Sequence, residues 1–384
     1  MVRSTFPTDK FKSLETPFYY YDISLLKETL KVIKEEAKKR NYIVHYAIKA
    51  NANKKILETI AAHGFGADCV SGNEVQAAAL AGFPPSKIVF AGVGKTDKEI
   101  ITALEVGISC FNVESLPELL VIDEIARKKG KTANVALRIN PNVDAETHKY
   151  ITTGTDENKF GLNVSQISSI IDIVPSLKNI NLVGAHYHIG SQIEKMEIFA
   201  RLCEEIQHIQ KIFDQHKIKL EHINVGGGLG VDYINPSEHP IPDFGAYFKV
   251  FEDHLKIGNE KVHFELGRSI VAQCGSLVTK VTYVKEGISK KFAIVDAGMT
   301  DLIRPALYDA YHKIENLTSD QPNQKYDVVG PICESSDCFA EDYELGGTKR
   351  GDILVLRSAG AYGEIMASGY NLRPLPKAYY SDLL

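Results

Sequence analysis

The chain has 384 residues, of which 44% are hydrophobic and 24% charged, and its formal net charge is −5. This composition is typical of a soluble globular protein, and it offers no basic patch for nucleic acid, no apolar run long enough to span a membrane and no signal sequence, so we expect a cytoplasmic protein without nucleic-acid or membrane partners. The six cysteines are scattered without zinc-ligand spacing, which predicts reduced thiols and no metal site.

Short β-rich runs alternate with helical stretches through the first two thirds of the chain. After a strand-like segment, Phe18–Tyr21, and a helical one, Ser24–Arg40, we expect strands at Ile43–Ile48, Gly66–Val70, Lys87–Ala91, Ser109–Val113, Asn134–Ile139, Asn181–His186, Glu221–Val225 and Val262–Glu265. Helical segments separate these strands, among them Asn53–Ala62, Ser115–Lys129 and Met196–Gln215. This alternation predicts a parallel sheet and an α/β fold, a (β/α)8 TIM barrel, with a doubly wound open sheet as the alternative.

The pattern changes after about residue 268. The β-rich runs Leu277–Val284, Lys291–Ala297, Lys325–Val329 and Asp352–Arg357 are separated by glycine-containing turns, without a long amphipathic helix between them. This pattern predicts a C-terminal all-β domain, either a β-barrel or a sandwich. We therefore expect the barrel at 23–268, and the all-β domain to combine 1–22 with 269–384.

Residues capable of chemistry fall at the ends of five predicted strands. They are Lys49, Asp68, His188, the glycine run Gly226, Gly227 and Gly228, and Glu265. The active site of a (β/α)8 barrel lies at the C-terminal ends of its strands. Five such strand ends therefore predict one shared site.

Lys49 and the glycine run suggest a covalent cofactor that carries a phosphate. Lys49 follows an apolar strand, and desolvation lowers the pKa of a lysine and makes its amine a nucleophile for Schiff-base formation. A lysine at a strand end more often only extends its amine to solvent. The backbone N–H groups of a glycine run can approach a phosphate, and barrels often bind phosphate after strands seven and eight, although an ordinary turn is equally consistent.

His188 and Glu265 extend this interpretation. The flat ring of His188 can stack on a cofactor plane, and Ser191 can donate a hydrogen bond to a phosphate. A carboxylate such as Glu265 beside a pyridine nitrogen keeps that nitrogen protonated, as an electron sink requires. The alternative for Glu265 is an ion pair with Arg268.

Seven motifs follow one another along nearly the whole chain. They are Tyr46-Ala47-Ile48-Lys49-Ala50-Asn51, His188-Ile189-Gly190-Ser191-Gln192, the glycine run, Glu265-Leu266-Gly267-Arg268, Arg304-Pro305-Ala306-Leu307-Tyr308, Cys333-Glu334-Ser335 and Ala361-Tyr362-Gly363. In this order the chain resembles the alanine-racemase-like, fold-type III pyridoxal 5′-phosphate (PLP) decarboxylases, and most closely those that act on diaminopimelate.

The resemblance implies PLP as the cofactor, with Lys49 as its covalent attachment point. The implied cofactor-binding residues are Lys49, Asp68, His188, Ser191, Gly226, Gly227, Gly228, Glu265, Gly267, Arg268 and Tyr362. The implied catalytic residues are Lys49, His188 and Cys333, with Cys333 as the proton donor. The resemblance also implies a homodimer with shared active sites, because Cys333 and Glu334 come from the partner subunit in this family.

The expected reaction converts meso-2,6-diaminopimelate to L-lysine and CO2, the last step of lysine biosynthesis. A substrate with two amino-acid ends needs a cation for its distal carboxylate and an anion for its distal ammonium. Arg304 with Tyr308 can supply the first and Glu334 the second, with Arg268 and Tyr362 as further substrate contacts. The alternatives are decarboxylation of arginine, ornithine or carboxynorspermidine, a non-catalytic PLP-binding homologue, and a regulatory homologue that binds a protein partner.

Overall fold

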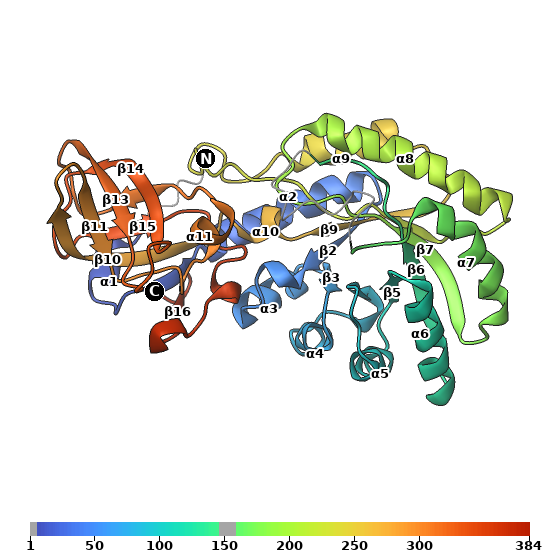
Figure 1. The fold of residues 1–384 in the computed structure, drawn as a ribbon. Helices are drawn as coiled ribbons and strands as arrows, with labels where there is room; N and C mark the ends of the chain where they lie inside the picture. The colour runs from blue at the N-terminus through green and yellow to red at the C-terminus, as the bar shows by residue number, and fades with distance from the viewer. Residues whose placement is uncertain (1–5, 146–158) are drawn as a thin grey trace. The chain divides into compact units, whose positions relative to one another are not determined.

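The computed structural model describes residues 6–145 and 159–384, which form two compact units (Figure 1). One unit comprises residues 30–230 and 243–267. The other comprises the described residues up to Thr29 together with residues 231–242 and 268–384. In the first unit eight parallel strands, β2 to β9, close into a barrel in which neighbours in sequence are also neighbours in the sheet. This confirms the expected (β/α)8 barrel and excludes the open sheet.

The barrel elements follow the predicted order. The strands are β2 (Ile43–Ala47), β3 (Gly66–Cys69), β4 (Ile88–Phe90), β5 (Cys110–Val113), β6 (Ala133–Arg138), β7 (Ile180–His186), β8 (His222–Asn224) and β9 (Lys261–Leu266). The helices are α2 (Ile23–Lys39), α3 (Lys54–Ala62), α4 (Gly72–Leu80), α5 (Asp97–Val106), α6 (Leu116–Lys128), α7 (Ile167–Ile173), α8 (Met196–Gln215) and α9 (Phe244–His254), with short 3-10 turns at η1 (Ile48–Ala50), η2 (Pro85–Lys87), η3 (Val164–Gln166) and η4 (Val174–Ser176). All the expected barrel strands are present.

Local sequence explains where these helices begin and which face they bury. At the start of α5, the side chain of Thr96 accepts a hydrogen bond from the backbone N–H of Glu99, and Glu99 in turn accepts one from the backbone of Thr96. Such a capping box satisfies N–H groups that have no partner inside the helix. In the long helix α8, apolar residues recur at helical spacing, and Leu202, Ile206 and Phe213 are fully buried.

One layer inside the barrel is polar, whereas apolar branched residues usually fill such interiors. His45, His222 and His263 pack together there, and we call them the histidine layer. His45 Nε2 lies 3.2 Å from His263 Nδ1, and the rings of His222 and His263 stack with centroids 4.5 Å apart. Two glycines leave room for the rings, because a Cβ would lie 2.3 Å from His45 Nδ1 at Gly66 and 2.4 Å from His222 Nε2 at Gly184.

The second unit is built mainly from sheet, as expected for an all-β domain. Its strands are ordered β12 (Ile314–Asn316), β15 (Ile353–Leu356), β10 (Gly275–Glu286), β11 (Lys291–Val295), β13 (Asn323–Val329) and β14 (Cys338–Gly346), while β1 (Phe18–Tyr21) pairs with β10 and with β16 (Lys377–Tyr380). Its helices are α1 (Thr8–Lys12), α10 (Arg268–Val271) and α11 (Arg304–Tyr308), with 3-10 turns η5 (Glu364–Met366) and η6 (Tyr370–Leu372).

The core of this unit forms where β1 and α1 pack on the sheet. One buried cluster of this core consists of Phe11, Phe18, Tyr20, Val278, Ile353 and Val355. β1 runs antiparallel to β10, with Phe18 opposite Val278, so the opening segment belongs to this sheet. Within the described ranges, the structure contains no helix long and apolar enough to cross a membrane.

Candidate active site

Lys49 lies directly after β2, at the end of the barrel where the parallel strands terminate. It occupies the turn η1, and the hydroxyl of Tyr46 closes this turn by donating to the backbone carbonyl of Asn51 at 2.8 Å. Gly267, which follows β9, packs on the same turn, and a Cβ there would lie 3.1 Å from the Cβ atom of Ala47. The side chain of Lys49 is therefore half-buried on a turn that its neighbours hold in place.

The charge of Lys49 reaches residues from three other strand ends. Burial raises the pKa of Asp68 well above its usual value, and nearby Glu265 raises it further, while Lys49 acts to lower it. Burial lowers the pKa of His188, and Lys49 lowers it further. Lys49 also helps to lower the pKa of Glu265. The structure thus brings together four residues that were predicted from separate strand ends.

Glu265 is a buried carboxylate that remains ionised. Its Oε1 accepts hydrogen bonds from Asn112 Nδ2 at 3.2 Å and Asn224 Nδ2 at 2.7 Å, and its Oε2 lies 2.9 Å from His186 Nε2. Burial by itself would raise the pKa of Glu265, but the interaction and hydrogen bond with His186, together with the charge of Lys49, lower it overall. The barrel therefore presents a fixed negative charge beside Lys49.

Burial shifts the pKa values of Asp68 and His188 in the directions that favour their uncharged forms. Asp68 is 2% exposed, and its Oδ1 has no hydrogen-bond partner among the described residues. A raised pKa for this carboxyl means that it can carry a proton and act as a donor. The lowered pKa of His188 leaves a neutral, flat ring at the barrel mouth.

The glycine run forms a tight turn after β8. Gly226 and Gly228 have φ angles of +72° and +109°, in the region that favours glycine. At Gly227 a Cβ would lie 1.9 Å from the carbonyl oxygen of Glu265, so this position admits no side chain. The N–H of Gly226 donates to Asn224 Oδ1 at 2.9 Å, and the N–H of Gly227 makes a longer contact of 3.4 Å with His188 Nδ1. The N–H of Gly228 and, in exchange for that longer contact, the N–H of Gly227 are the candidates to bind an anion.

Ser191 comes from a segment tied to this turn. The N–H of Ile193 donates to the carbonyl of Gly228 at 2.9 Å. A Cβ at Gly228 would lie 3.1 Å from the carbonyl oxygen of Gly190, the residue before Ser191. The expected phosphate ligands of the barrel therefore lie on adjoining backbone segments.

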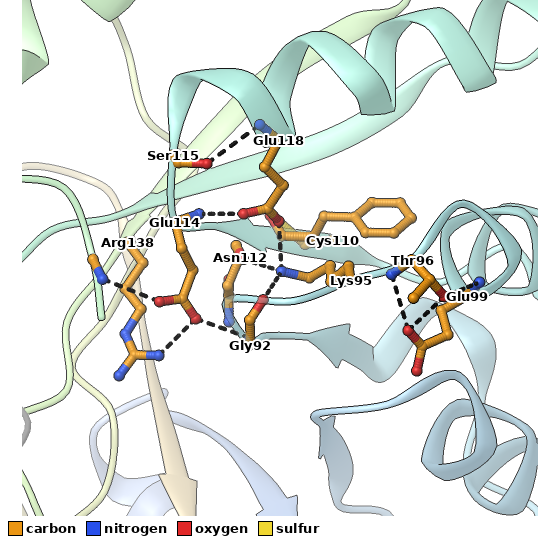
Figure 2. A network of polar contacts seen from close by, with 12 residues as sticks. Gly92, Lys95, Thr96, Glu99, Cys110, Asn112, Glu114, Ser115, Glu118 and Arg138 are labelled. Carbon is orange, nitrogen blue, oxygen red and sulfur yellow. Dashed lines mark hydrogen bonds and ion pairs between the residues drawn. The ribbon is translucent and has the colours of Figure 1, made fainter. Parts of the chain in front are cut away.

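Several polar residues at this end of the barrel were not predicted. Asn112, His186 and Asn224 surround Glu265, and Arg138 extends the site. Arg138 Nη1 donates to Glu114 Oε1 at 2.8 Å, and Glu114 also accepts hydrogen bonds from the N–H of Gly92 and of Gly161, as Figure 2 shows in part. The overlooked signal is a polar residue at an inward position of a strand that is otherwise apolar, as in Phe111-Asn112-Val113.

The all-β unit contains a cluster of two buried arginines, Arg268 and Arg304, around Tyr233. The hydroxyl oxygen of Tyr233 accepts hydrogen bonds from Arg268 Nη1 at 2.7 Å and from Arg304 Nη1 at 3.1 Å. Burial would raise the pKa of Tyr233, but the two guanidinium groups lower it. Tyr233 was not predicted, although it follows the glycine run closely in sequence.

Tyr308 and Tyr362 lie beside Arg268. The guanidinium of Arg268 lies 5.0 Å from the centroid of the Tyr362 ring. Burial disfavours the charge of Arg268, yet the phenols of Tyr233, Tyr362 and Tyr308 raise its pKa overall. Four predicted residues, Arg268, Arg304, Tyr308 and Tyr362, are thus gathered around Tyr233.

Cys333 and Glu334 lie in an exposed segment of the same unit. Cys333 is exposed, whereas Cys69, Cys110, Cys203 and Cys274 are buried. The N–H of Cys333 donates to Asn371 Oδ1 at 3.3 Å, and the hydroxyl of Tyr370 donates to Glu334 Oε1 at 2.5 Å. These contacts place Cys333 and Glu334 with the turn η6 rather than in the arginine cluster.

Comparison with known proteins agrees with this arrangement. Residues 24–272 match the family described as pyridoxal-dependent decarboxylase, pyridoxal binding domain. The chain is 58% identical to a diaminopimelate decarboxylase of Bacteroides thetaiotaomicron over 100% of both chains, and 42% identical to one of Neisseria meningitidis over 93% of this chain and 86% of that one.

A solved structure matches the fold over nearly the whole chain. The crystal structure of diaminopimelate decarboxylase from Helicobacter pylori complexed with L-lysine superposes with a TM-score of 0.92 and 41% identity, covering 97% of this chain and 93% of the other. A full-length match at 58% identity and a family match that spans the barrel lead to one assignment. The chain belongs to the pyridoxal-dependent decarboxylases, in the family of the diaminopimelate decarboxylases.

Proposed function

We propose that this protein decarboxylates meso-2,6-diaminopimelate to L-lysine and CO2 with PLP as its cofactor. The observation that carries the proposal is the meeting of Lys49, an ionised Glu265 and a glycine turn at one end of the barrel. The names of the relatives support the substrate, and a lysine complex of the Helicobacter pylori relative supports the product.

The residues at the barrel mouth fit PLP in three respects. Lys49 offers an amine for an aldehyde, and the N–H groups of Gly227 and Gly228, with Ser191, offer donors for a phosphate. Asp68 has a buried oxygen atom that lacks a protein partner among the described residues, so it can meet a polar group of a ligand. Glu265 offers a fixed negative charge for a protonated ring nitrogen.

Each residue then has a defined task in the reaction. PLP, when bound, supplies an electron sink for the pair of electrons that remains when a carboxylate leaves as CO2. Glu265 holds a proton at the ring nitrogen, because its own low pKa keeps it ionised. The neutral ring of His188 would offer a flat, uncharged surface to the cofactor. Lys49 would hold PLP through its amine, the nucleophile that an aldehyde requires.

The arginine cluster supplies the recognition of carboxylates. Arg304 with Tyr308 binds the distal carboxylate of the substrate, and Arg268 with Tyr362 provides contacts for substrate and phosphate. Guanidinium groups bind carboxylates through paired N–H donors. Burial and hydrogen bonds to Tyr233 hold both arginines in fixed positions before a ligand arrives.

We place the remaining functions on a homodimer. Cys333 donates the proton that replaces the departing CO2, and Glu334 binds the distal ammonium, both acting in the active site of the partner subunit. The exposed thiol of Cys333, whose N–H donates to Asn371 of η6, and the exposed apolar residues in and after η6 support an interface, since Leu372 is 98% and Leu375 62% exposed. The free cysteines suit a reducing compartment, so we place the protein in the cytoplasm.

The alternatives make different demands on these residues. Arginine and ornithine lack a distal carboxylate, so a decarboxylase for them has no use for Arg304. A non-catalytic PLP-binding protein has no use for an exposed thiol and acid at Cys333 and Glu334. Both features therefore favour diaminopimelate.

A parallel assay tests the proposal. The purified protein, supplied with PLP, is incubated separately with meso-diaminopimelate, arginine, ornithine and carboxynorspermidine, and CO2 and amine products are identified by mass. We expect lysine from diaminopimelate, and no product from Lys49→Ala. Lys54→Ala, which removes a lysine with an 87% exposed side chain, is the control and should retain activity. Product from another substrate but not from diaminopimelate would refute the proposal.

A further inference from the structure

Asn224 joins two parts of the candidate cofactor site with a single side chain. Its Nδ2 donates to Glu265 Oε1 at 2.7 Å, and its Oδ1 accepts the N–H of Gly226 at 2.9 Å. The backbone N–H of Gly226 can only donate, which fixes the orientation of the amide and directs Nδ2 toward the carboxylate. Asn224 is fully buried, so water does not compete for either bond.

The backbone around Asn224 reinforces this connection. The N–H of Glu265 donates to the carbonyl of Gly226 at 2.8 Å. Gly227 rests directly on the carbonyl oxygen of Glu265, because a Cβ there would lie 1.9 Å from it. The turn itself contains residues with positive φ and has no regular ladder of its own. The amide of Asn224 is therefore a side-chain contact that aligns the turn with the carboxylate, and its two bonds are shorter than the 3.4 Å contacts that His188 Nδ1 and the Tyr247 hydroxyl make with Gly227.

Asn112 provides a natural comparison. It donates to the same oxygen, Glu265 Oε1, at 3.2 Å, and it is also fully buried. Asn112 comes from β5, however, and its Oδ1 accepts no hydrogen bond within the described residues. Of these two asparagines, Asn224 bonds to both the carboxylate and the glycine turn, whereas the side chain of Asn112 bonds to the carboxylate and not to the turn among the described residues.

We propose that Asn224 is a positioning residue that fixes the spacing between the phosphate-binding turn and the carboxylate for the ring nitrogen. This inference rests on the proposed function, which places PLP between these two groups. A ligand that spans the turn and the carboxylate gains binding free energy from both contacts only if the distance between the two groups is already correct before the ligand binds. Removal of the Asn224 side chain should then reduce the affinity that the phosphate contributes, although Asn224 itself need not contact the phosphate.

The test measures cofactor affinity rather than activity. Protein freed of cofactor is titrated with PLP and with pyridoxal, which lacks the phosphate, and the ratio of the two affinities reports the contribution of the phosphate. We expect Asn224→Ala to lower this ratio by about tenfold or more, as for a lost hydrogen bond in a buried site. Asn112→Ala should weaken both ligands together and leave the ratio unchanged.

Asn224→Asp gives a second variant that keeps the inference testable if Asn224→Ala does not fold. Its carboxyl retains an acceptor for the N–H of Gly226 but has no donor for Glu265 Oε1, so the link between turn and carboxylate is broken and the ratio should again fall. An unchanged ratio in Asn224→Ala or in Asn224→Asp, or an equal ratio in Asn224→Ala and Asn112→Ala, would overturn the inference. Wild-type protein that binds no PLP would instead overturn the proposed function, and the two failures are therefore distinguishable.

Discussion

At the scale of single residues, Glu265 carries a negative charge inside a barrel, where an unpaired charge is costly. Three donors, Asn112, Asn224 and His186, share its two oxygen atoms. His186 also has an Nδ1 atom without a hydrogen-bond partner among the described residues. The surroundings thus stabilise the charge of Glu265.

The variant Glu265→Gln tests the role of this charge. A glutamine keeps the shape and can pair with the other tautomer of His186, so the fold should persist. It cannot keep a ring nitrogen protonated, and we expect kcat to fall by on the order of 10² to 10³. Steady-state kinetics and circular dichroism would measure the two effects. The control Glu252→Gln, at a side chain that is 51% exposed, should change neither kcat nor the fold. Wild-type turnover in Glu265→Gln would show that the negative charge of Glu265 is not needed for the reaction.

The predictable part of the site consists of residues at strand ends. Lys49, the glycine run and Glu265 could be found because polar or flexible residues interrupt apolar strands at their C-terminal ends. Asn112 and Asn224 fall within the expected strands Ser109–Val113 and Glu221–Val225 rather than after them, so their positions did not mark them as site residues. Tyr233 could not be predicted because its role depends on Arg304, which is distant in sequence and contacts Tyr233 only in the folded chain.

At the scale of elements, the histidine layer joins β2, β8 and β9 inside the barrel. Burial lowers the pKa of His45, of His222 to about 4 and of His263 to about 2, and the neighbouring imidazoles add to the effect on His222 and His263. The charged or titratable groups around the layer are Glu265, His186, Lys87 and Lys261. The folded barrel therefore holds these rings uncharged at neutral pH.

Acid should destabilise the barrel through this layer. An unfolded chain binds a proton at His222 below its ordinary pKa of 6.5, whereas the folded chain does so only near pH 4. Stability is therefore complete above about pH 6.5 and falls as the pH drops toward 4, by about 1.4 kcal/mol per pH unit for one such group. We expect His222→Phe, which keeps a ring against His263, to reduce this slope in urea unfolding measured at several pH values.

A matched control separates this effect from a general one. His208 is on α8, and its side chain is 65% exposed. His208→Phe makes the same chemical change without altering a buried group, so its slope should equal that of the wild type. If His222→Phe also showed the wild-type slope, the histidine layer would not be the source of acid sensitivity.

A buried ion pair ties β4, β5 and α6 together (Figure 2). Lys95 Nζ donates to Glu118 Oε1 at 2.6 Å and to the backbone carbonyls of Gly92 and Asn112. The side chains of Lys95 and Glu118 are 1% and 9% exposed. Because Asn112 also contacts Glu265, this pair supports the wall of the candidate site.

Loss of one partner of this pair should be costly. Lys95→Met leaves the Glu118 carboxylate buried without its cation, and we expect the free energy of unfolding to fall by about 3–5 kcal/mol. Lys128→Met removes a lysine that pairs with Glu124 at the surface, where both side chains are more than half exposed, and should cost at most about 1 kcal/mol. Urea denaturation compares the two, and equal small losses would show that Lys95 is dispensable.

The barrel strands could be predicted with their order, but three strands of the all-β unit could not. β12 and β14 lie at the two ends of the strand order, and β16 pairs with β1 alone. Edge strands are less apolar than central ones. β14 carries Glu341, Asp342 and Glu344, and β12 contains three residues, so neither shows the β-rich run that marked β10 and β15.

At the scale of the whole molecule, the proposed function assigns the cofactor to the barrel unit and the proton donor to the all-β unit of a partner subunit. The chain passes between its two units after Thr29, Gly230, Pro242 and Gly267. Residues 231–242, which include Tyr233, therefore belong to the all-β unit although they follow the glycine turn directly. The order of the sequence alone does not reveal that a short segment between two barrel elements belongs to the other unit.

Mixing two inactive variants tests the shared active site. Lys49→Ala and Cys333→Ala should each be nearly inactive, but random exchange of subunits gives hybrids with one intact site, and about a quarter of wild-type activity should return. Lys49→Ala mixed with Glu265→Gln should recover nothing, because every barrel then carries a defect. Absence of recovery in the first mixture, with exchange verified by mass, would place Cys333 in the active site of its own chain.

The covalent anchoring of the cofactor at Lys49 is the central claim and can be measured directly. Reduction of the PLP-loaded protein with borohydride, followed by proteolysis and mass spectrometry, locates the lysine that carries the cofactor. We predict that the reduced cofactor is found on the peptide containing Lys49. Attachment to a different lysine, or an unmodified Lys49 in a preparation that still releases CO2 from diaminopimelate, would contradict the account.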